Sequence, residues 1–578
     1  MSEKVFKENR QIFLERCPEA FFFLPHLNRT PHALGAEKKQ KEQLEQWLLA
    51  KNLSDVDLLY VYGTGLGCPY LVFKHWLEKK KQRELVFLEE NSSHLASFLS
   101  TKHAKECLTH PRVHFFLYEK ERREEALQEV AHQFPISRIE LVAAFPHKEE
   151  ELFEIRLVLF RKTTLAEAFL SDTLFSHRHF ANFLPNLKQI ASSSLINQMK
   201  GRFKKIPALI CGAGASLQEA ISFFPEVQQK ALVIAGGSAI AALSSQGILP
   251  HIAMAFDPNF EEFLRMKSSF AFETPFFFAT RLFHEAFATC NGPLGYVRSA
   301  IGGLEELWMD EKLSLNKKGF VGEKLSPEAL SVTTVAIALA RYLGADPIIL
   351  AGVDLSYKDL KRYAEGVVID NHIHRDEMER GSIASDRIFA RKNLKKEKIY
   401  TTTKWLMESS VISSYAKEFP STRFFTTSDA LCIDGIPFIS WEDLIEKELK
   451  RDFDLSSYLH AEMAQSRFSQ DAQKKLDRMC KGLKKSFVRC AHLIEKILQE
   501  LEAGSGFSGK MVLFEMDLQE EDAFLYFLSE LPLAIDRVLE RKYRGSCKSD
   551  PQVALQRTKE KWKQMLQAAQ DHVAVFSP

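Results

Sequence analysis

The sequence has few cysteines, and none lies in a pattern typical of a disulfide framework or a zinc site. Nine cysteines are scattered over 578 residues, with no Cys-x-x-Cys pair and no histidine at zinc-ligand spacing. An odd, dispersed set of this kind indicates reduced thiols. We therefore expect a cytoplasmic protein.

Long apolar runs are missing as well. The longest, at 21–25 and 275–279, are far shorter than the ~20 residues that cross a bilayer. The first 17 residues are charged throughout and lack the apolar centre of a signal peptide. The sequence predicts neither a membrane span nor a secretory leader.

The chain has almost no net charge, since 77 Lys and Arg residues balance 76 Asp and Glu residues. No general attraction to nucleic acid or to an anionic membrane follows from such a balance. Hydrophobic residues make up 45% and charged residues 26%, which is typical of soluble globular proteins. The length predicts about three or four domains.

Two segments alternate short apolar runs with helical stretches, which is typical of parallel βαβ units. They cover 51–165 and 206–445. Helical regions are expected before, between and after them, at 1–50, 166–205 and 446–578. The predicted fold class is α/β, with two Rossmann-like parallel-sheet domains in tandem and helical N- and C-terminal regions.

The first of these domains contains a glycine-rich turn. The apolar run 58–62 ends in Gly63-Thr-Gly65-Leu-Gly67, and Glu89 closes the next run, 22 residues past Gly67. That spacing suits an acid that reaches a ribose, and the pattern resembles that of S-adenosylmethionine-dependent methyltransferases. The alternative is a structural turn. We favour the structural turn because Cys68-Pro69 follows directly and no second motif supports methyl transfer.

The second domain contains a similar turn at Gly212, Gly214 and Ser216, between an apolar run and a helical stretch. Ser216 and Glu219 have the spacing of a capping box, which predicts that a helix starts there. The free N–H groups of a helix N-terminus favour a phosphate. The alternative is a glycine turn that only lets the strand and the helix pack closely.

Further polar residues follow the next apolar runs of this domain. Gly236, Gly237 and Ser238 end the second run, Asp257 ends the third, and Asp354 follows 347–352. Because the carboxyl ends of parallel strands share one edge of a sheet, we expect these residues to meet there. Each aspartate is a candidate to hold a ribose, bind an ion or accept a proton, or else a simple turn cap.

A metal site is not predicted. His372 and His374 are two residues apart in a polar stretch that looks like a loop, and no Asp-x-Asp pair follows a strand of the second domain. Two residues at such spacing lie on one face only in a strand.

Several segments resemble the MptE-like (DUF115) domain family. They are 207–258, with its Gly-Ala-Gly-Ala-Ser-Leu turn, 331–354 and 401–435. The N-terminal glycine turn and the segment Asn182-Phe-Leu-Pro-Asn186 are similar to the motility accessory factors.

This resemblance implies a glycosyltransferase that moves a sugar, such as a nonulosonic acid from a CMP-activated donor, to Ser or Thr of a protein. The implied partners are a nucleotide sugar and flagellin or another surface protein, with no metal and no nucleic acid. In that interpretation Asp257 and Asp354 are the catalytic candidates. The donor contacts come from Gly212, Gly214, Ser216, Gly236, Gly237 and Ser238.

Two alternatives stay open. The other branch of the family implies a 6-hydroxymethyl-dihydropterin diphosphokinase that uses ATP and Mg²⁺, with Asp257 and Asp354 as ligands. A non-catalytic scaffold that keeps a nucleotide pocket is the third hypothesis. It is suggested by Ala215, Val353 and 426–428, which replace the usual residues of the family.

Overall fold

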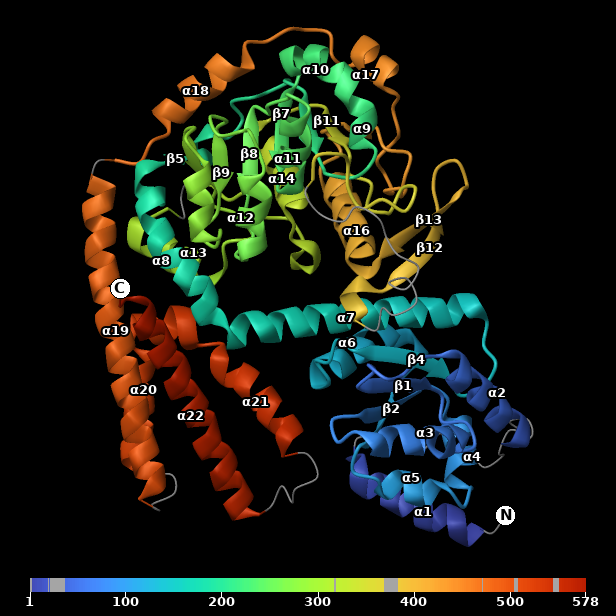
Figure 1. Ribbon diagram of the computed structural model, residues 1–578. Helices are drawn as coiled ribbons and strands as arrows, with labels where there is room; N and C mark the ends of the chain where they lie inside the picture. The colour runs from blue at the N-terminus through green and yellow to red at the C-terminus, as the bar shows by residue number, and fades with distance from the viewer. Residues whose placement is uncertain are drawn as a thin grey trace. The chain divides into compact units, whose positions relative to one another are not determined.

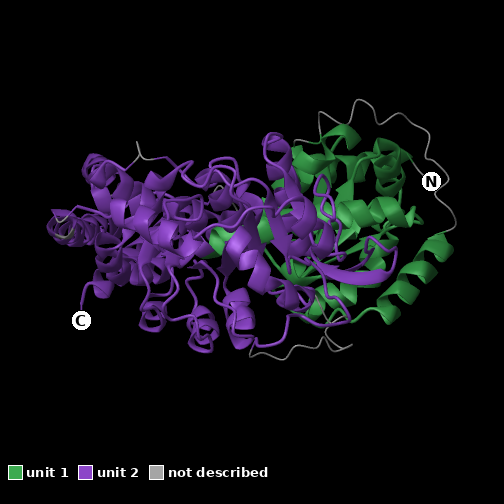
Figure 2. Ribbon diagram, turned by 90° about the horizontal axis from the view of Figure 1, so that it is seen from above, with its two compact units in different colours: residues 1–171, 375–387, 540–548 green, residues 172–374, 388–539, 549–578 purple. Residues whose placement is uncertain are grey.

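The computed structural model describes residues 3–18, 20, 37–315, 319–367, 383–469, 471–503, 508–543 and 550–577. The chain divides into two compact units (Figure 2). The first comprises 1–171, 375–387 and 540–548, and the second 172–374, 388–539 and 549–578. Each contains a parallel sheet with helices around it, so the predicted fold class is confirmed.

The first unit has a four-stranded parallel sheet in the order β3-β2-β1-β4. Its strands are β1 Leu58–Tyr62, β2 Glu84–Glu89, β3 Val113–Leu117 and β4 Ile139–Ala143. Its helices are α1 Glu3–Arg16, α2 Glu37–Ala50, α3 Cys68–Lys79, α4 Ser92–Leu99, α5 Ala104–Thr109 and α6 Arg123–Gln133. Every residue of β1 and β2 is buried, because helices cover both faces of a parallel sheet.

The second unit has an eight-stranded sheet in the order β14-β11-β6-β7-β8-β9-β10-β5, with every pairing parallel (Figure 1). The strands are β5 Ser194–Leu195, β6 Ala208–Cys211, β7 Leu232–Gly236, β8 Ile252–Ala255, β9 Phe276–Phe278, β10 Leu294–Tyr296, β11 Ile348–Ala351 and β14 Phe424–Thr426. The chain order reverses between β6 and β11, which is the position where open α/β sheets bind ligands.

Helices of the second unit cover this sheet. They are α8 Ser176–Ser192, α9 Leu217–Ala220, α10 Phe224–Lys230, α11 Ser238–Ser245, α12 Phe260–Lys267, α13 Gly303–Leu313, α14 Val332–Leu343, α16 Thr403–Glu418 and α17 Trp441–Lys447. A hairpin, β12 Ile388–Lys392 and β13 Lys398–Thr402, precedes α16. The helix α7 Glu149–Leu174 spans the boundary between the two units in sequence.

The helix α14 shows how the sequence dictates this core. Ser331 caps its N-terminus in a capping box with Thr334, and Gly344 ends it with a φ of 97°. Nine residues of the helix are buried, and eight of them belong to the hydrophobic core of the sheet. A sequence of small and branched apolar residues between a serine cap and a glycine stop predicts such a helix.

The C-terminal region is helical, as predicted. Its elements are α18 Leu455–Gln465, α19 Asp471–Glu502, α20 Gly509–Gln519, a π-helical turn Phe524–Leu528, α21 Leu531–Lys542 and α22 Pro551–Val575. Residues 504–507 and 544–549 of this region lie outside the described residues, as do His372 and His374. No helix within the described residues is both long enough and apolar enough to cross a membrane.

Candidate functional site

The candidate site lies at the carboxyl edge of the eight-stranded sheet. The turns that follow β6, β7, β8 and β11 all emerge at this edge, because the strands run parallel. They carry the predicted residues of 212–216, 236–238, Asp257 and Asp354. We refer to this edge as the rim.

The turn after β6 packs tightly against the segment after β11. Gly212 N–H donates to the carbonyl of Ala351 and Gly214 N–H to that of Gly352, each at 2.8 Å. A Cβ on Gly212 would lie 2.4 Å from the Gly352 oxygen, and one on Gly214 would lie 2.6 Å from the Asp354 carboxyl. Glycine is therefore required at both positions by close packing of the chain on itself.

Asp354 is enclosed by this turn. Its carboxylate is 2% exposed and accepts hydrogen bonds from Ser216 N–H at 2.9 Å, from the Ser216 hydroxyl and from the Ser428 hydroxyl at 2.6 Å. Burial raises the pKa of this carboxyl, although the donors from Ser216 and Ser428 favour its charged form. In this structure the anion that the 212–216 turn binds is the chain's own Asp354.

The predicted capping box at Ser216 is wrong. The helix α9 does begin at Leu217, but the Ser216 side chain makes no capping bond, because its hydroxyl donates to Asp354. Glu219 instead forms an ion pair with Lys358 at 2.6 Å. With only four residues, α9 offers little of the aligned dipole on which the phosphate argument rested.

The turn after β7 has a different environment. Gly236 is packed against Val332, since a Cβ there would lie 2.2 Å from that side chain. Gly237 has a φ of 52° and precedes α11, a helix of eight residues. Among the described residues, a Cβ on Gly237 would meet a single atom within 4 Å, Glu262 Oε1 at 3.8 Å. Residues 236–238 are half-buried, so this turn is partly accessible.

Asp257 follows β8 and belongs to a small charged cluster. One carboxylate oxygen accepts from Asn259 N–H at 3.0 Å and from the Asn259 side chain at 2.7 Å. The other lies 3.8 Å from Arg265 Nη1, which also donates to Glu262 at 2.9 Å. A third of the Asp257 side chain is exposed, so it is the more accessible of the two predicted aspartates.

Glu262 and Arg265 were not among the predicted site residues. Glu262 is 1% exposed, and burial raises the pKa of its carboxyl against the opposing charge of Arg265. Their separation of three residues on α12, directly after the Asp257 turn, is the sequence signal that points to a charged pair. It does not show that the pair faces the rim.

Two asparagines of α8 hold the rim turns in place. Asn182 donates to the carbonyl of Pro258 at 2.8 Å and accepts from His284 N–H at 3.2 Å. Asn186 donates to the carbonyls of Thr280 at 3.0 Å and Leu282 at 2.7 Å. The Asn-Phe-Leu-Pro-Asn segment thus fixes the loops after β8 and β9.

The glycine turn of the first unit is filled by the chain. A Cβ on Gly63 would lie 2.6 Å from the Phe145 ring, and Leu66 N–H donates to the Gln40 side chain at 3.3 Å. Glu89, 3% exposed, accepts from both N–H and hydroxyl of Thr64, each at 2.8 Å, and from Asn91 N–H at 2.9 Å. The structural interpretation of this turn fits these contacts.

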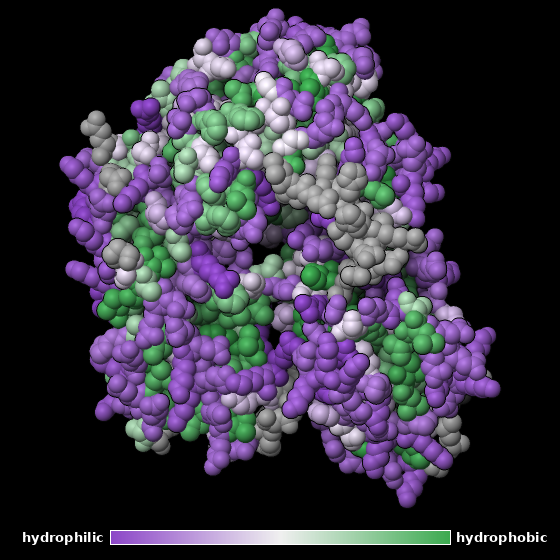
Figure 3. Space-filling view, in the orientation of Figure 1, coloured by the Kyte–Doolittle hydropathy of each residue, from purple (hydrophilic) through white to green (hydrophobic). Residues whose placement is uncertain are grey.

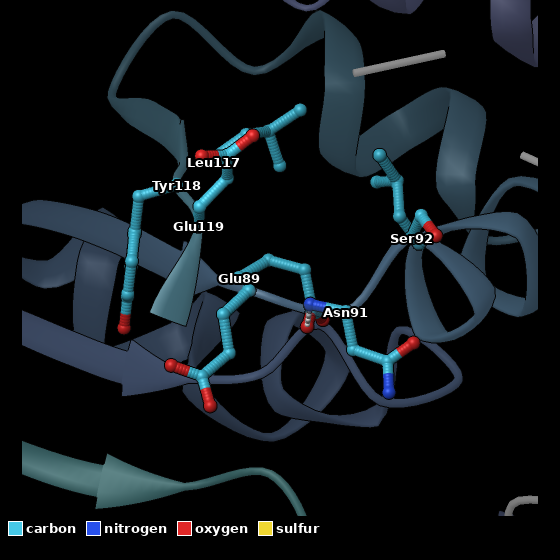
Figure 4. Close-up of a pocket in the computed structure, with 8 residues that line it drawn as sticks. Glu89, Asn91, Ser92, Leu117, Tyr118 and Glu119 are labelled. Carbon is cyan, nitrogen blue, oxygen red and sulfur yellow. Dashed lines mark hydrogen bonds between the residues drawn. The ribbon is translucent and has the colours of Figure 1, made fainter. Parts of the chain in front are cut away.

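A pocket of about 160 Å³ lies beside it, at the carboxyl ends of β2 and β3 (Figure 4). Its lining is mostly acidic and apolar: Glu89, Glu90, Asn91, Ser92, Leu95, Leu117, Tyr118 and Glu119. Glu90 is paired with Arg123 at 2.8 Å. Such a lining disfavours phosphates, so we place no nucleotide-sugar site there.

Among the described residues, no group of three His, Cys, Asp or Glu side chains is arranged to hold a metal ion.

Comparisons with known proteins agree with the sequence resemblance. Residues 181–360 match the family described as 6-hydroxymethylpterin diphosphokinase MptE-like. The structure is similar to that of the MAf glycosyltransferase from Magnetospirillum magneticum AMB-1, with a TM-score of 0.53 and 14% sequence identity. That alignment covers 100% of this chain and 98% of the other. At this identity the similarity establishes the fold.

No curated protein sequence matches the chain. The predicted resemblance to the MptE-like domain is confirmed, and the chain shares the fold of a MAf glycosyltransferase.

Proposed function

We propose that this chain, whose residues 181–360 form an MptE-like domain, is a glycosyltransferase that binds a nucleotide sugar at the rim of its larger sheet. The donor favoured by the resemblance is a CMP-activated nonulosonic acid, and the acceptor is Ser or Thr of a protein such as flagellin. The fold shared with a MAf glycosyltransferase over nearly the whole of both chains supports this proposal.

One observation supports placing the donor site at the rim. The partly accessible Gly236–Ser238 turn opens α11, and Glu262 of the cluster that contains Asp257 lies next to Gly237. The turn supplies backbone N–H groups at a helix N-terminus, which favour a phosphate. Asp257 supplies a half-buried carboxylate that is suited to orient a ribose or an acceptor hydroxyl. The 212–216 turn and Asp354 then have a structural role, since they pack against each other at the same edge of the sheet.

The surface next to this turn is suited to bind a polypeptide acceptor. Phe260 and Leu264, one helical turn apart on α12, are each 49% exposed, and Phe270 is 66% exposed. Figure 3 shows a cluster of hydrophobic residues over α12. Exposed apolar clusters of this kind mark protein-binding surfaces. Phe260 follows the Asp257–Asn259 turn directly, so a bound segment would lie beside the donor.

Isothermal titration with CMP and CDP tests the donor assignment. We expect both to bind, and we expect Gly237→Val to weaken binding roughly 10-fold or more by crowding the turn. Gly247→Val is the control: Gly247 also has a positive φ, 74°, and among the described residues no atom lies within 4 Å of its Cβ position. Gly237, with a φ of 52° and a ψ of −124°, has a conformation that essentially only glycine adopts, so circular dichroism must first show that Gly237→Val is folded. Only Gly237→Val should change the affinity.

Failure of the folded wild-type protein to bind either nucleotide would contradict the proposal. The family description favours a second candidate, the pterin diphosphokinase. Turnover of 6-hydroxymethyl-dihydropterin that requires ATP and Mg²⁺ would establish that candidate instead.

A further inference from the structure

Arg265 is linked to the Gly236–Ser238 turn through Glu262, which lies beside Gly237. Its side chain is 28% exposed, and its Nη1 lies 2.9 Å from the Glu262 carboxylate and 3.8 Å from that of Asp257. It is thus half-buried and held in position, although its partners leave part of it in contact with solvent. An arginine in such a position binds phosphate with several parallel N–H donors.

Two buried atoms of this pair lack partners. Glu262 Oε1 and Arg265 Nε are inaccessible to solvent and have no hydrogen-bond partner among the described residues. Glu262 Oε1 is the atom that lies 3.8 Å from the Cβ position of Gly237, so it is directed at the turn. A buried polar atom without a partner costs about 1–3 kcal/mol. The charged pair is therefore incomplete in the free protein.

We propose that Arg265 and Glu262 together bind the phosphate of the donor at the N-terminus of α11. Arg265 supplies the charge. Glu262 accepts from Arg265 through Oε2 and, in its protonated form, donates through Oε1 to a phosphate oxygen at the turn. The ligand class is a nucleoside monophosphate ester, and the inference rests on the proposed function.

The charge balance of the cluster supports this role. With both carboxylates ionised the cluster would carry one net negative charge and repel a phosphate. Burial of Glu262 favours its neutral form, and the neighbouring Asp257 adds to this effect, while Arg265 opposes it. A neutral Glu262 leaves Arg265 balanced by Asp257 alone. The helix N-terminus then adds a favourable dipole for an anion.

The experiment compares variants by isothermal titration with CMP and with cytidine, which lacks the phosphate. Arg265→Gln should weaken CMP binding roughly 10- to 100-fold and leave cytidine binding unchanged. Glu262→Gln should keep most of the CMP affinity, because its amide oxygen still accepts from Arg265 and its amide nitrogen still donates at the turn. If Arg265→Gln fails to fold, the double variant Glu262→Gln/Arg265→Gln avoids an unpaired buried carboxylate and should show the same loss.

Arg281→Gln is the matched control. Arg281 follows β9 at the same rim, is 27% exposed and lies 3.9 Å from Asp172, so it resembles Arg265 in burial and in its partner. Its substitution should leave CMP affinity unchanged. Equal losses in Arg265→Gln and Arg281→Gln, or no loss in either, would overturn the inference while leaving the donor assignment intact. No binding of CMP or CDP to the wild type would overturn both.

Discussion

The glycine turns of the two units look alike in sequence and differ in what their polar groups contact. In the first unit, Leu66 N–H of the turn donates to Gln40, and Glu89 accepts hydrogen bonds from Thr64 and Asn91. In the second unit, Asp354 likewise accepts a hydrogen bond from Ser216 of the 212–216 turn. The 236–238 turn instead lies next to the Glu262–Arg265 pair, two atoms of which have no hydrogen-bond partner among the described residues. A glycine fingerprint therefore identifies a tight turn, and the contacts of its polar groups decide whether a ligand is needed to complete them.

The largest expected effect is on the stability of the protein and comes from a substitution in the 212–216 turn. It tests whether this turn has room for a ligand. Gly214→Val should destabilise the protein by about 3 kcal/mol, because a Cβ there meets the Asp354 carboxyl and the Gly352 carbonyl, and overpacking of this kind is costly. Urea denaturation measures the change. Gly482→Val, at a helix glycine whose Cβ position has no atom of the described residues within 4 Å outside its own helix backbone, serves as the control and should cost much less. A stable Gly214→Val would show that the turn has room for a ligand.

A second test concerns another acid buried at the rim. Tyr296 donates to Glu306, and burial raises the pKa of Glu306 to about 8. The folded protein then holds a proton that the unfolded chain releases above its ordinary pKa of 4.5. The stability contributed by this group is complete below about pH 4.5 and is lost as the pH rises to about 8.

Glu306→Gln should therefore flatten the pH dependence of the urea midpoint between pH 5 and 8. An unchanged slope in this variant would mean that Glu306 is ionised in the folded protein.

The smallest expected effects come from removing one hydrogen bond from each of the two buried carboxylates, Glu89 in the first unit and Asp354 in the second. Thr64→Val removes one hydroxyl donor from Glu89, and Ser428→Ala removes one from Asp354. Each should cost about 1–2 kcal/mol, because a buried carboxylate loses one of its hydrogen bonds. CMP affinity should stay the same in both variants. Weaker CMP binding in Thr64→Val would assign a ligand role to the first unit.

Much of the fold follows from local sequence. Residues 331–344 carry both helix caps, and the strands β1, β6 and β7 are continuous apolar runs. By contrast, β5, β10 and β14 are two or three residues long, too short for a periodic pattern, and they were not predicted.

The site was less predictable because its decisive contacts join distant residues. Ser216 and Asp354 are 138 positions apart, and Ser428 adds a third partner 74 positions beyond Asp354. The sequence pattern placed Ser216 and Asp354 at one edge of the sheet, but it did not predict that Ser216 and Ser428 donate hydrogen bonds to Asp354. Likewise, the Glu262–Arg265 pair is visible in the sequence of α12, but its position against Gly237 is set by the sheet.

The paired asparagines of α8 have a practical consequence for dissecting this protein. A fragment cut at residue 206, where the alternating pattern of the second sheet begins, would lose the side-chain bonds that tether the carbonyls of Pro258, Thr280 and Leu282. The loop that bears Asp257 would then be free to drift. Any attempt to isolate the eight-stranded sheet and its rim should retain the chain from residue 176 onward.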